Sequence, residues 1–331
     1  MRYRFSHKTY RRPLARPLRT AHGNWTEREG LVLRLEDENG RAGFGEVAPI
    51  PWLGTETLAA AEAACASLGA TVADEVLDAV PARLGCVRFA LAQARSEPAA
   101  PVAATRLPVA ALLPAGIAAL AALREKLAAG FLVFKWKVGV GALDDELGLL
   151  DEILGGMPAH TKLRLDANGG WSRREAAHWL DRCAGRPIEF VEQPVAPVDE
   201  DALRGLAEDF PVTLALDESV LHLTDARRWQ GLGWPGVFVV KPALAGPLAE
   251  VAAWIVATKA DVVFSSAIET ALGRSAILRL ALQPGQTARA LGFGVDGIFG
   301  DRCWDGPHLG PVADVSGIAP DAGAEIWSAL N

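Results

Sequence analysis

The chain has 331 residues, of which half are apolar and 22% charged, and its formal net charge is −7. This is the composition of a globular protein, and the acidic balance without any Lys/Arg-rich block argues against a nucleic-acid-binding surface. The longest apolar run, 109–123, contains Pro114 and Gly116 and is too short to span a bilayer. The basic N-terminus lacks the apolar stretch of a secretory signal, and the four cysteines have no metal-like spacing, so we expect a reduced, cytoplasmic protein.

The first hundred residues contain strand patterns followed by helical patterns. In chain order we expect an edge strand at 1–20 and a polar loop at 20–29. A hairpin formed by 30–36 and 42–47 follows, and then a set of helices at 56–97. Strands and helices that are segregated along the sequence are typical of an α+β domain. We therefore predict a small α+β domain over residues 1–100.

From residue 106 the pattern changes to a regular alternation of strand and helix. The expected strands are 107–113, 132–138, 162–166, 189–192, 213–217, 237–241, 262–266 and 292–295, and helical stretches lie between them, as at 117–129, 173–183 and 199–209. Repeated βα units of about 25 residues are typical of a (β/α)8 barrel, which we predict over residues 101–310. Residues 311–331 form a C-terminal segment that packs on the first domain. A doubly wound open sheet is the second architecture, but no GxGxxG follows the first strand.

The sequence FLVFKWKV at 131–138 has two lysines on one expected strand. Residues i and i+2 of a strand project to the same face, so Lys135 and Lys137 lie side by side. Burying two ammonium groups next to each other is costly. A lone KxK most often ends a strand with both lysines in solvent, so the neighbouring strands decide the interpretation.

Polar residues end each of the following strands, at the side of a barrel where active sites are built. Asp166, Glu192 and Asp217 come from three successive strands. Three carboxylates form a hard-oxygen site, which suits Mg²⁺. The lysines near this site, with Lys241 on the strand across from Lys137, are pushed toward their neutral forms by neighbouring positive charge. A metal with paired lysines is equipment for removing a proton next to a carboxylate.

The ordered motifs resemble the enolase superfamily, specifically its muconate-lactonizing-enzyme-like subgroup and, within it, the o-succinylbenzoate synthases. They are KWK at 135–137, RLDANGGW at 164–171, VEQP at 191–194, LDES at 216–219, VKP at 240–242, FSSAIE at 264–269 and GFGEVAPIPWLGTET at 43–57. The resemblance covers nearly the whole chain. It implies a modified (β/α)8 barrel with an N-terminal capping domain over the barrel mouth.

The resemblance also implies a reaction and a set of roles. The enzyme would be a hydro-lyase that converts 2-succinyl-6-hydroxy-2,4-cyclohexadiene-1-carboxylate, a small-molecule carboxylate, to o-succinylbenzoate in menaquinone or phylloquinone biosynthesis. Asp166, Glu192 and Asp217 would ligate Mg²⁺, with Mn²⁺ as a substitute. Three lysines would be catalytic. Lys137 would be the base, Lys135 would orient the carboxylate, and Lys241 would be the cation–π partner of the ring. Substrate-binding positions would be Ser265, Ser266, Asn168 and Arg164.

Two capping loops, 20–29 and 49–55, would shield the site from water. Trp25 and Trp52 are candidate lid contacts, although packing between the domains explains them equally well. His22 is a weaker candidate for a substrate contact, and we expect Glu46 to be a structural partner.

Other functions fit the same residues. An N-acylamino acid racemase or dipeptide epimerase would use Lys137 and Lys241 as bases on opposite faces of a carbon. Relatives that act on dipeptides carry a DxD pair on the last strand, where this chain reads GFGVDG with Asp296 alone. A catalytically silent barrel that acts as a binding protein predicts the loss of a ligand or lysine, and none is lost. The sequence does not fix the oligomeric state.

Overall fold

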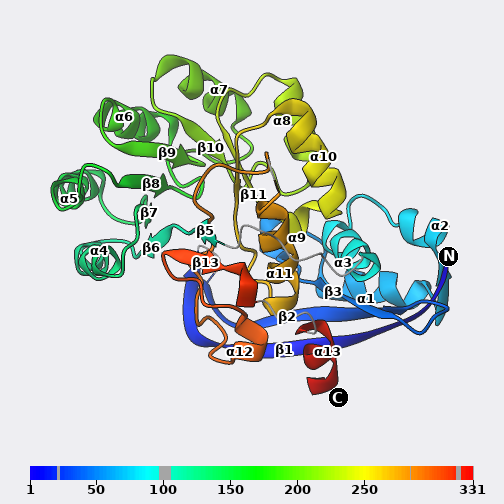
Figure 1. The fold of residues 1–331 in the computed structure, drawn as a ribbon. Helices are drawn as coiled ribbons and strands as arrows, with labels where there is room; N and C mark the ends of the chain where they lie inside the picture. Colours follow the sequence, from blue (N-terminus) through cyan, green and yellow to red (C-terminus); the bar gives the residue numbers. More distant parts are fainter. Residues whose placement is uncertain (21–22, 97–105, 284, 318–321, 331) are drawn as a thin grey trace.

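The computed structural model describes residues 1–20, 23–96, 106–283, 285–317 and 322–330. Figure 1 shows a ring of parallel strands with helices outside it, next to a long antiparallel hairpin that has its own helices. The predicted barrel with an α+β capping domain is confirmed.

The capping domain contains a four-stranded antiparallel sheet in the order β3-β2-β1-β4. Its strands are β1 (Arg2–Thr20), β2 (Gly23–Glu36), β3 (Ala42–Val47) and β4 (Thr71–Ala73). The predicted hairpin is present, since β2 pairs with β3 from Leu31↔Val47 to Glu36↔Ala42.

Two expectations for this region need correction. The polar segment 20–29, expected as a loop, lies in β1 and β2 over its described residues, because β1 supplies backbone partners along almost the whole of β2. Polar side chains do not prevent a strand when a neighbouring strand satisfies its backbone groups. The edge strand expected at 1–20 is only partly correct: β4 pairs with β1 at Arg2–Arg4, and beyond Arg4 only β2 pairs with β1 among the described residues.

Three helices cover the capping sheet: α1 (Leu58–Ser67), α2 (Asp74–Asp78) and α3 (Gly85–Arg95). A short 3₁₀ helix, Pro51–Leu53, lies in the expected loop 49–55. Helix α3 packs directly on β3, where glycines permit the contact. A Cβ added at Gly43 or Gly45 would lie 1.9 Å from a carbonyl oxygen of α3. The capping domain therefore has a close-packed core between sheet and helix.

The barrel is built on a seven-stranded parallel sheet in sequence order. Its strands are β6 (Ala111–Leu113), β7 (Val133–Lys137), β8 (Lys162–Asp166), β9 (Ile188–Glu192), β10 (Leu214–Leu216), β11 (Val237–Val240) and β12 (Val262–Phe264). Leu291 and Gly292 close the ring through isolated parallel bridges to Val109 and Ser265. The eighth strand expected at 292–295 is thus reduced to these two bridging residues.

Helices follow the strands around the outside of the barrel (Figure 1). They are α4 (Ala118–Ala128), α5 (Leu143–Gly155), α6 (Arg173–Cys183), α7 (Glu200–Asp209), α8 (Leu223–Gly231), α9 (Pro242–Ala245), α10 (Leu248–Thr258), α11 (Ala271–Ala281) and α12 (Arg302–Asp305). In β7, Phe134 and Trp136 are fully buried, and the ring of Trp136 lies 6.1 Å from that of Trp179 in α6. Because strand side chains alternate, Lys135 and Lys137 face the barrel interior.

The C-terminal segment contacts both parts of the molecule. Strand β13 (Val312–Asp314) pairs with β5 (Arg106–Pro108) at the barrel, and helix α13 (Ala322–Ala329) lies against β3. Lys8 of β1 donates a hydrogen bond of 3.2 Å to the Trp327 carbonyl. Within the described ranges, no helix has the length and hydropathy needed to cross a membrane.

Candidate active site

The polar strand ends meet at one end of the barrel. Lys137 pairs in register with Asp166, and Asp166 with Glu192. Neighbouring residues in parallel register point to the same side of a sheet, so these three side chains lie next to one another. Asp217 directly follows β10, and Lys241 precedes α9 as its N-cap residue. The structure thus brings together all six candidate metal ligands and lysines.

Lys135 lies between two of the carboxylates. Its Nζ is 2.8 Å from Asp166 Oδ2 and 2.7 Å from Glu192 Oε1, and Lys241 makes a similar contact with Asp217. Burial lowers the pKa of Lys135 and of Lys241, but the surrounding carboxylates outweigh burial and the net pKa shift of both is upward. The lowered lysine pKa expected from the sequence is therefore not produced by these side chains alone. It requires additional positive charge next to them.

The carboxyl groups of the site repel one another. Burial and the charge of Asp166 raise the pKa of Glu192 well above its ordinary value. Burial and the charges of Asp217 and Asp166 raise the pKa of Glu218 to about 7. Glu218 was not among the predicted site residues, although it follows Asp217 in the LDES motif. Four carboxyl groups thus face three lysines, a charge balance that a bound cation would improve.

The donor chemistry fits Mg²⁺. Asp166, Glu192 and Asp217 offer only carboxylate oxygens, and each is at most 7% exposed. Over the residues for which the structure gives side chains, no three His, Cys, Asp or Glu groups are already arranged around one point. The Lys135 ammonium occupies the position between Asp166 and Glu192 instead. An ion bound by these carboxylates would compete with Lys135 for the same oxygen atoms.

Lys137 has a different environment from Lys135. Its Nζ donates to Asn168 Oδ1 at 2.6 Å. The amide of Asn168 also donates to Glu218 at 3.1 Å, and its backbone N–H donates to Asp166. Asn168, two residues after the end of β8, adopts a left-handed backbone with φ of 46°. Lys137 is therefore held by a neutral amide, whereas Lys135 is held by two carboxylates.

Two buried side chains that shape this site were missed in the sequence. Gln193 is fully buried, and its amide oxygen accepts from the backbone N–H groups of Asp217 and Ser219 at 3.1 and 3.2 Å. Its amide nitrogen donates to Val195 O and Ser219 Oγ, so Gln193 ties the end of β9 to the end of β10. The one available signal was its place beside Glu192 in the VEQP motif.

Glu146 is the second missed residue. It lies in the first turn of α5 and is 4% exposed. Its carboxylate accepts from the backbone N–H groups of Gly139, Val140 and Gly141 at 2.8–3.1 Å. Glu146 therefore fixes the loop that directly follows Lys137.

Arg164 was predicted to bind substrate, and the structure gives it another partner. Its side chain is 1% exposed and its Nε donates to Glu189 at 2.7 Å, with the guanidinium 4.8 Å from the ring of Phe190. Glu189 also pairs with Arg289 at 2.7 Å. These groups lie toward the opposite end of the barrel from Asp166. The assignment of Arg164 to substrate stays an unsupported prediction.

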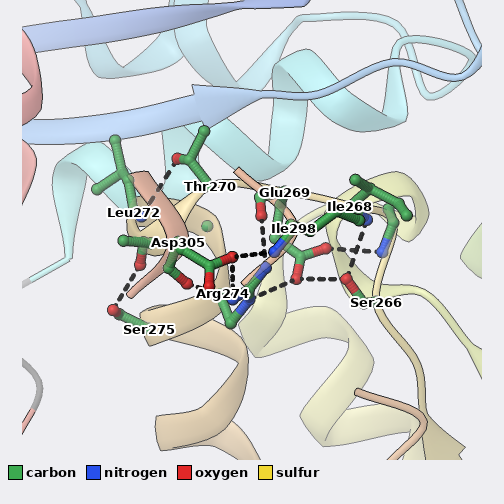
Figure 2. Close-up of polar contacts among 12 residues, drawn as sticks. Ser266, Ile268, Glu269, Thr270, Leu272, Arg274, Ser275, Ile298 and Asp305 are labelled. Atoms are coloured by element: carbon green, nitrogen blue, oxygen red, sulfur yellow. Dashed lines mark hydrogen bonds and ion pairs between the residues drawn. The ribbon is translucent and has the colours of Figure 1, made fainter. Parts of the chain in front are cut away.

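The two candidate serines lie in the loop between β12 and α11. Ser265 Oγ is 3.3 Å from the Gly292 carbonyl. Ser266 Oγ donates to Glu269 at 2.9 Å and accepts from the N–H of Ile268, as Figure 2 shows. The hydroxyl of Ser265 thus makes a longer hydrogen bond within the protein than the hydroxyl of Ser266.

The candidate lid residues pack on each other. Trp25 of β2 and Trp52 of the 3₁₀ helix form an edge-to-face pair with ring centroids 4.7 Å apart. This contact links the two segments expected to cover the barrel mouth. His22 lies outside the described residues. Glu46 is a structural partner: it is fully buried and accepts from Tyr10 at 2.6 Å and from Thr270.

Comparison with known proteins explains this arrangement. Residues 118–296 match the family described as "Enolase C-terminal domain-like", and residues 6–98 match "MenC, N-terminal domain". An o-succinylbenzoate synthase of Thermosynechococcus vestitus is 42% identical over 88% of this chain and 92% of its own length. The chain belongs to the o-succinylbenzoate synthase family. The predicted resemblance is thereby confirmed.

Other relatives agree with this family assignment. The o-succinylbenzoate synthase of Edwardsiella ictaluri is 34% identical over 83% of this chain and 86% of its own. The crystal structure of the enzyme from Thermosynechococcus elongatus BP-1, complexed with Mg in its active site, has a TM-score of 0.86 and 38% identity, and covers 99% of this chain and 100% of that one. The L-Ala-D/L-Glu epimerase of Bacillus subtilis, with a TM-score of 0.75 at 21% identity over 94% of this chain and 95% of that one, shares the fold.

Proposed function

We propose that this family member is the hydro-lyase that converts 2-succinyl-6-hydroxy-2,4-cyclohexadiene-1-carboxylate to o-succinylbenzoate in menaquinone or phylloquinone biosynthesis. One observation carries the proposal: Lys137 and Lys241 flank a buried carboxylate cluster in a chain 42% identical to an o-succinylbenzoate synthase. Strands β7 and β11 lie four positions apart in a ring of eight, so the two lysines face each other across the barrel.

Lys137 is the base. In its neutral form it takes the proton from the ring carbon that bears the carboxylate, and the electron pair left behind moves into that carboxylate. The Lys137 ammonium then gives the proton to the hydroxyl group on the same face, the C–O bond breaks, and water leaves. The product ring is aromatic, so the elimination is favourable once the first proton has been removed. Asn168, 2.6 Å from the amine, orients Lys137 for both transfers.

The acidic side chains would hold Mg²⁺ through Asp166, Glu192 and Asp217. When bound, the ion supplies positive charge that stabilises the negative charge developing on the substrate carboxylate. Lys135, beside Asp166 and Glu192, would orient that same substrate carboxylate. Lys241 lies against the opposite ring face as a cation–π partner.

The remaining contacts are with the succinyl end of the substrate. Ser265 and Ser266 lie on the strand-end loop next to Lys241 and are the proposed contacts, with Asn168 beside the base. The partner is a small-molecule carboxylate, and a biosynthetic enzyme of this kind acts in the cytoplasm.

Racemisation of N-acylamino acids or epimerisation of dipeptides is the competing reaction. It would use Lys137 and Lys241 as bases on the two faces of one carbon. Asp296 is the one carboxylate of this chain in the region where dipeptide-binding relatives carry the DxD pair. It already has partners: Oδ2 lies 2.7 Å from His308 Nδ1, and Oδ1 accepts from the N–H of Leu309 at 2.8 Å. This occupied carboxylate disfavours recognition of a substrate ammonium group.

The test is an ultraviolet assay of the purified protein with the cyclohexadiene substrate, first with Mg²⁺ and then with EDTA. We expect rapid loss of the diene absorbance that stops when the metal is removed. A metal-loaded protein that leaves the diene untouched would refute the proposal, and proton–deuterium exchange on N-acylamino acids and dipeptides would then test the competing reaction. A silent barrel would turn over none of these substrates.

A further inference from the structure

The loop between β12 and α11, residues 265–270, is held in place by buried charged side chains from two directions. We refer to it as the β12–α11 loop. It carries Ser265 and Ser266, the proposed contacts for the succinyl end. Figure 2 shows how its polar groups turn toward charged neighbours.

Barrel residues hold the loop from one side. Glu269 accepts from Ser266 Oγ at 2.9 Å and from the N–H of Ala267 at 2.7 Å. Arg274 of α11 donates to the Glu269 carbonyl at 3.2 Å and to the Asp305 carbonyl, and its guanidinium lies 3.6 Å from the carboxylates of both. Glu269 and Arg274 are fully buried, so this network is closed to solvent.

The capping domain holds the loop from the other side. Arg28 of β2 donates to the carbonyl oxygens of Ile268 at 3.0 Å and Ala267 at 3.4 Å, and to the Pro49 carbonyl at 2.7 Å. Arg28 is 1% exposed, its guanidinium lies 5.3 Å from the ring of Trp25, and it forms no salt bridge with a carboxylate among the described residues. All the hydrogen bonds described for this buried guanidinium go to carbonyl oxygens, so it fixes the backbone that it binds.

The backbone that Arg28 binds is strained. Ile268 has a φ of 59°, in the left-handed region that β-branched residues avoid. Such a conformation is unfavourable for this residue type and persists only where the surroundings enforce it. Arg28 binds the carbonyl groups of Ile268 and of the residue before it, so it is well placed to enforce this conformation. Glu46 contributes at the end of the loop by accepting from the N–H groups of Thr270 and Gly273.

We propose that Arg28 of the capping domain is a positioning residue that sets the shape of the β12–α11 loop for the non-reacting, succinyl end of the substrate. The inference rests on the proposed function for the identity of that substrate. Arg28 itself acts through the loop and does not touch the reacting atoms. The capping domain would then contribute to substrate recognition through the barrel loop as well as by covering the barrel mouth.

A second interdomain contact provides a matched control. Arg88 of α3 pairs with Glu250 of α10 at 2.7 Å and also joins the capping domain to the barrel. Its partner lies on an outer helix, and among the described residues Arg88 makes no hydrogen bond to the β12–α11 loop. Arg28→Met and Arg88→Met each remove one arginine between the domains, but only the first releases the loop.

Steady-state kinetics separate positioning from domain packing. For Arg28→Met we expect KM for the cyclohexadiene substrate to rise about tenfold and kcat to change by less than about threefold, because binding of the non-reacting end is lost. Arg28→Lys, which keeps the charge, should recover part of the KM, and Arg88→Met should stay within about twofold of the wild type. Mg²⁺ affinity should be unchanged in all three. Equal KM changes in Arg28→Met and Arg88→Met, or a fall in kcat alone, would overturn the proposal.

Hydrogen–deuterium exchange tests the loop without relying on activity. Amides in peptides that cover 264–274 should exchange faster in Arg28→Met than in the wild type, with no change in Arg88→Met or in peptides that cover 188–195. If exchange responds as expected but the wild type does not consume the diene, the proposed substrate is wrong and the role of Arg28 in shaping the loop stands. Unaltered exchange in Arg28→Met overturns that role whatever the activity. If Arg28→Met does not fold, Arg28→Lys carries both measurements, with intermediate effects expected.

Discussion

Buried charges occur at both ends of the barrel, and the two groups are organised differently. At the end away from the site, Glu189 lies between Arg164 and Arg289, and Arg289 also pairs with Asp261. Burial raises the pKa of Glu189, but Arg164 and Arg289 outweigh it and the net pKa shift is downward. At the site end, burial and neighbouring carboxylates raise the pKa of Glu192.

The difference lies in how the charges are balanced. At the end away from the site, two guanidinium groups and two carboxylates compensate one another's charge, which leaves no demand for a further ion. We call this group the lower cluster; it consists of Arg164, Glu189, Asp261 and Arg289. The site end places four carboxyl groups among three lysines, and Glu192 and Glu218 are pushed toward their neutral forms. Like charges held together by a rigid sheet are typical of a functional site, because folding alone gives no reason to keep them there. The comparison separates a structural ion-pair cluster from a candidate metal centre.

The largest expected effect is on turnover. Lys137→Ala should lower kcat by at least about 10³-fold, since it removes the proposed base while its neighbours stay in place. The steady-state rate at which the diene absorbance disappears measures kcat, and circular dichroism confirms that the variant is folded. Lys162→Ala, at the opposite end of β8, is the control and should retain activity. Appreciable residual turnover in Lys137→Ala would exclude this lysine as the base.

The next effect is on metal binding. Asp217→Asn should weaken Mg²⁺ binding by about 100-fold or more, because a charged ligand becomes a neutral amide. The increase in thermal stability on Mg²⁺ titration measures the affinity without using activity. Asp261→Asn removes a carboxylate from the lower cluster and should leave Mg²⁺ affinity unchanged. If both variants bind Mg²⁺ like the wild type, the ligand set is misassigned.

Arg164→Met tests the lower cluster through stability. Removal of one partner from a buried ion pair leaves Glu189 less well compensated, so the free energy of unfolding should fall by about 3 kcal/mol. Urea denaturation of the metal-free protein measures this change. Mg²⁺ affinity should be close to that of the wild type. A normal stability together with a raised KM would instead support the sequence-based assignment of Arg164 to substrate.

The parts of the site that were predictable are those fixed by strand periodicity. The expected strand at 162–166 matches β8 residue for residue, and a parallel register then brings Asp166 next to Lys137 and Glu192. Gln193 and Glu146 were missed because their partners are backbone N–H groups of loops, whose shapes the sequence pattern does not specify.

The errors have a similar origin in contacts made by distant segments. Residues 23–29 became a strand because β1 pairs with them, and no local feature of the sequence reports that partner. Arg164 was assigned to the site because it shares a face with Asp166. Arg164 nonetheless lies two residues before Asp166 along the strand, and at that level of the barrel its neighbour is Glu189. Periodicity gives the face of a side chain, and packing decides its partner.

The smallest expected effect is the pH dependence of the lower cluster. The pKa of Glu189 is lower in the folded protein than in the unfolded chain, where the pKa of a Glu is about 4.3. Its contribution to stability is therefore fully present above that unfolded value and is lost as the pH falls through the folded pKa. Glu189→Gln should be less stable than the wild type at pH 7, and the difference between the two should shrink as the pH is lowered below about 4.3. Urea denaturation at a series of pH values from 7 downward measures it, with Glu125→Gln on the exposed surface of α4 as the control. A stability difference between the two proteins that stays constant over this pH range would mean that the charge of Glu189 does not contribute to the stability of the lower cluster.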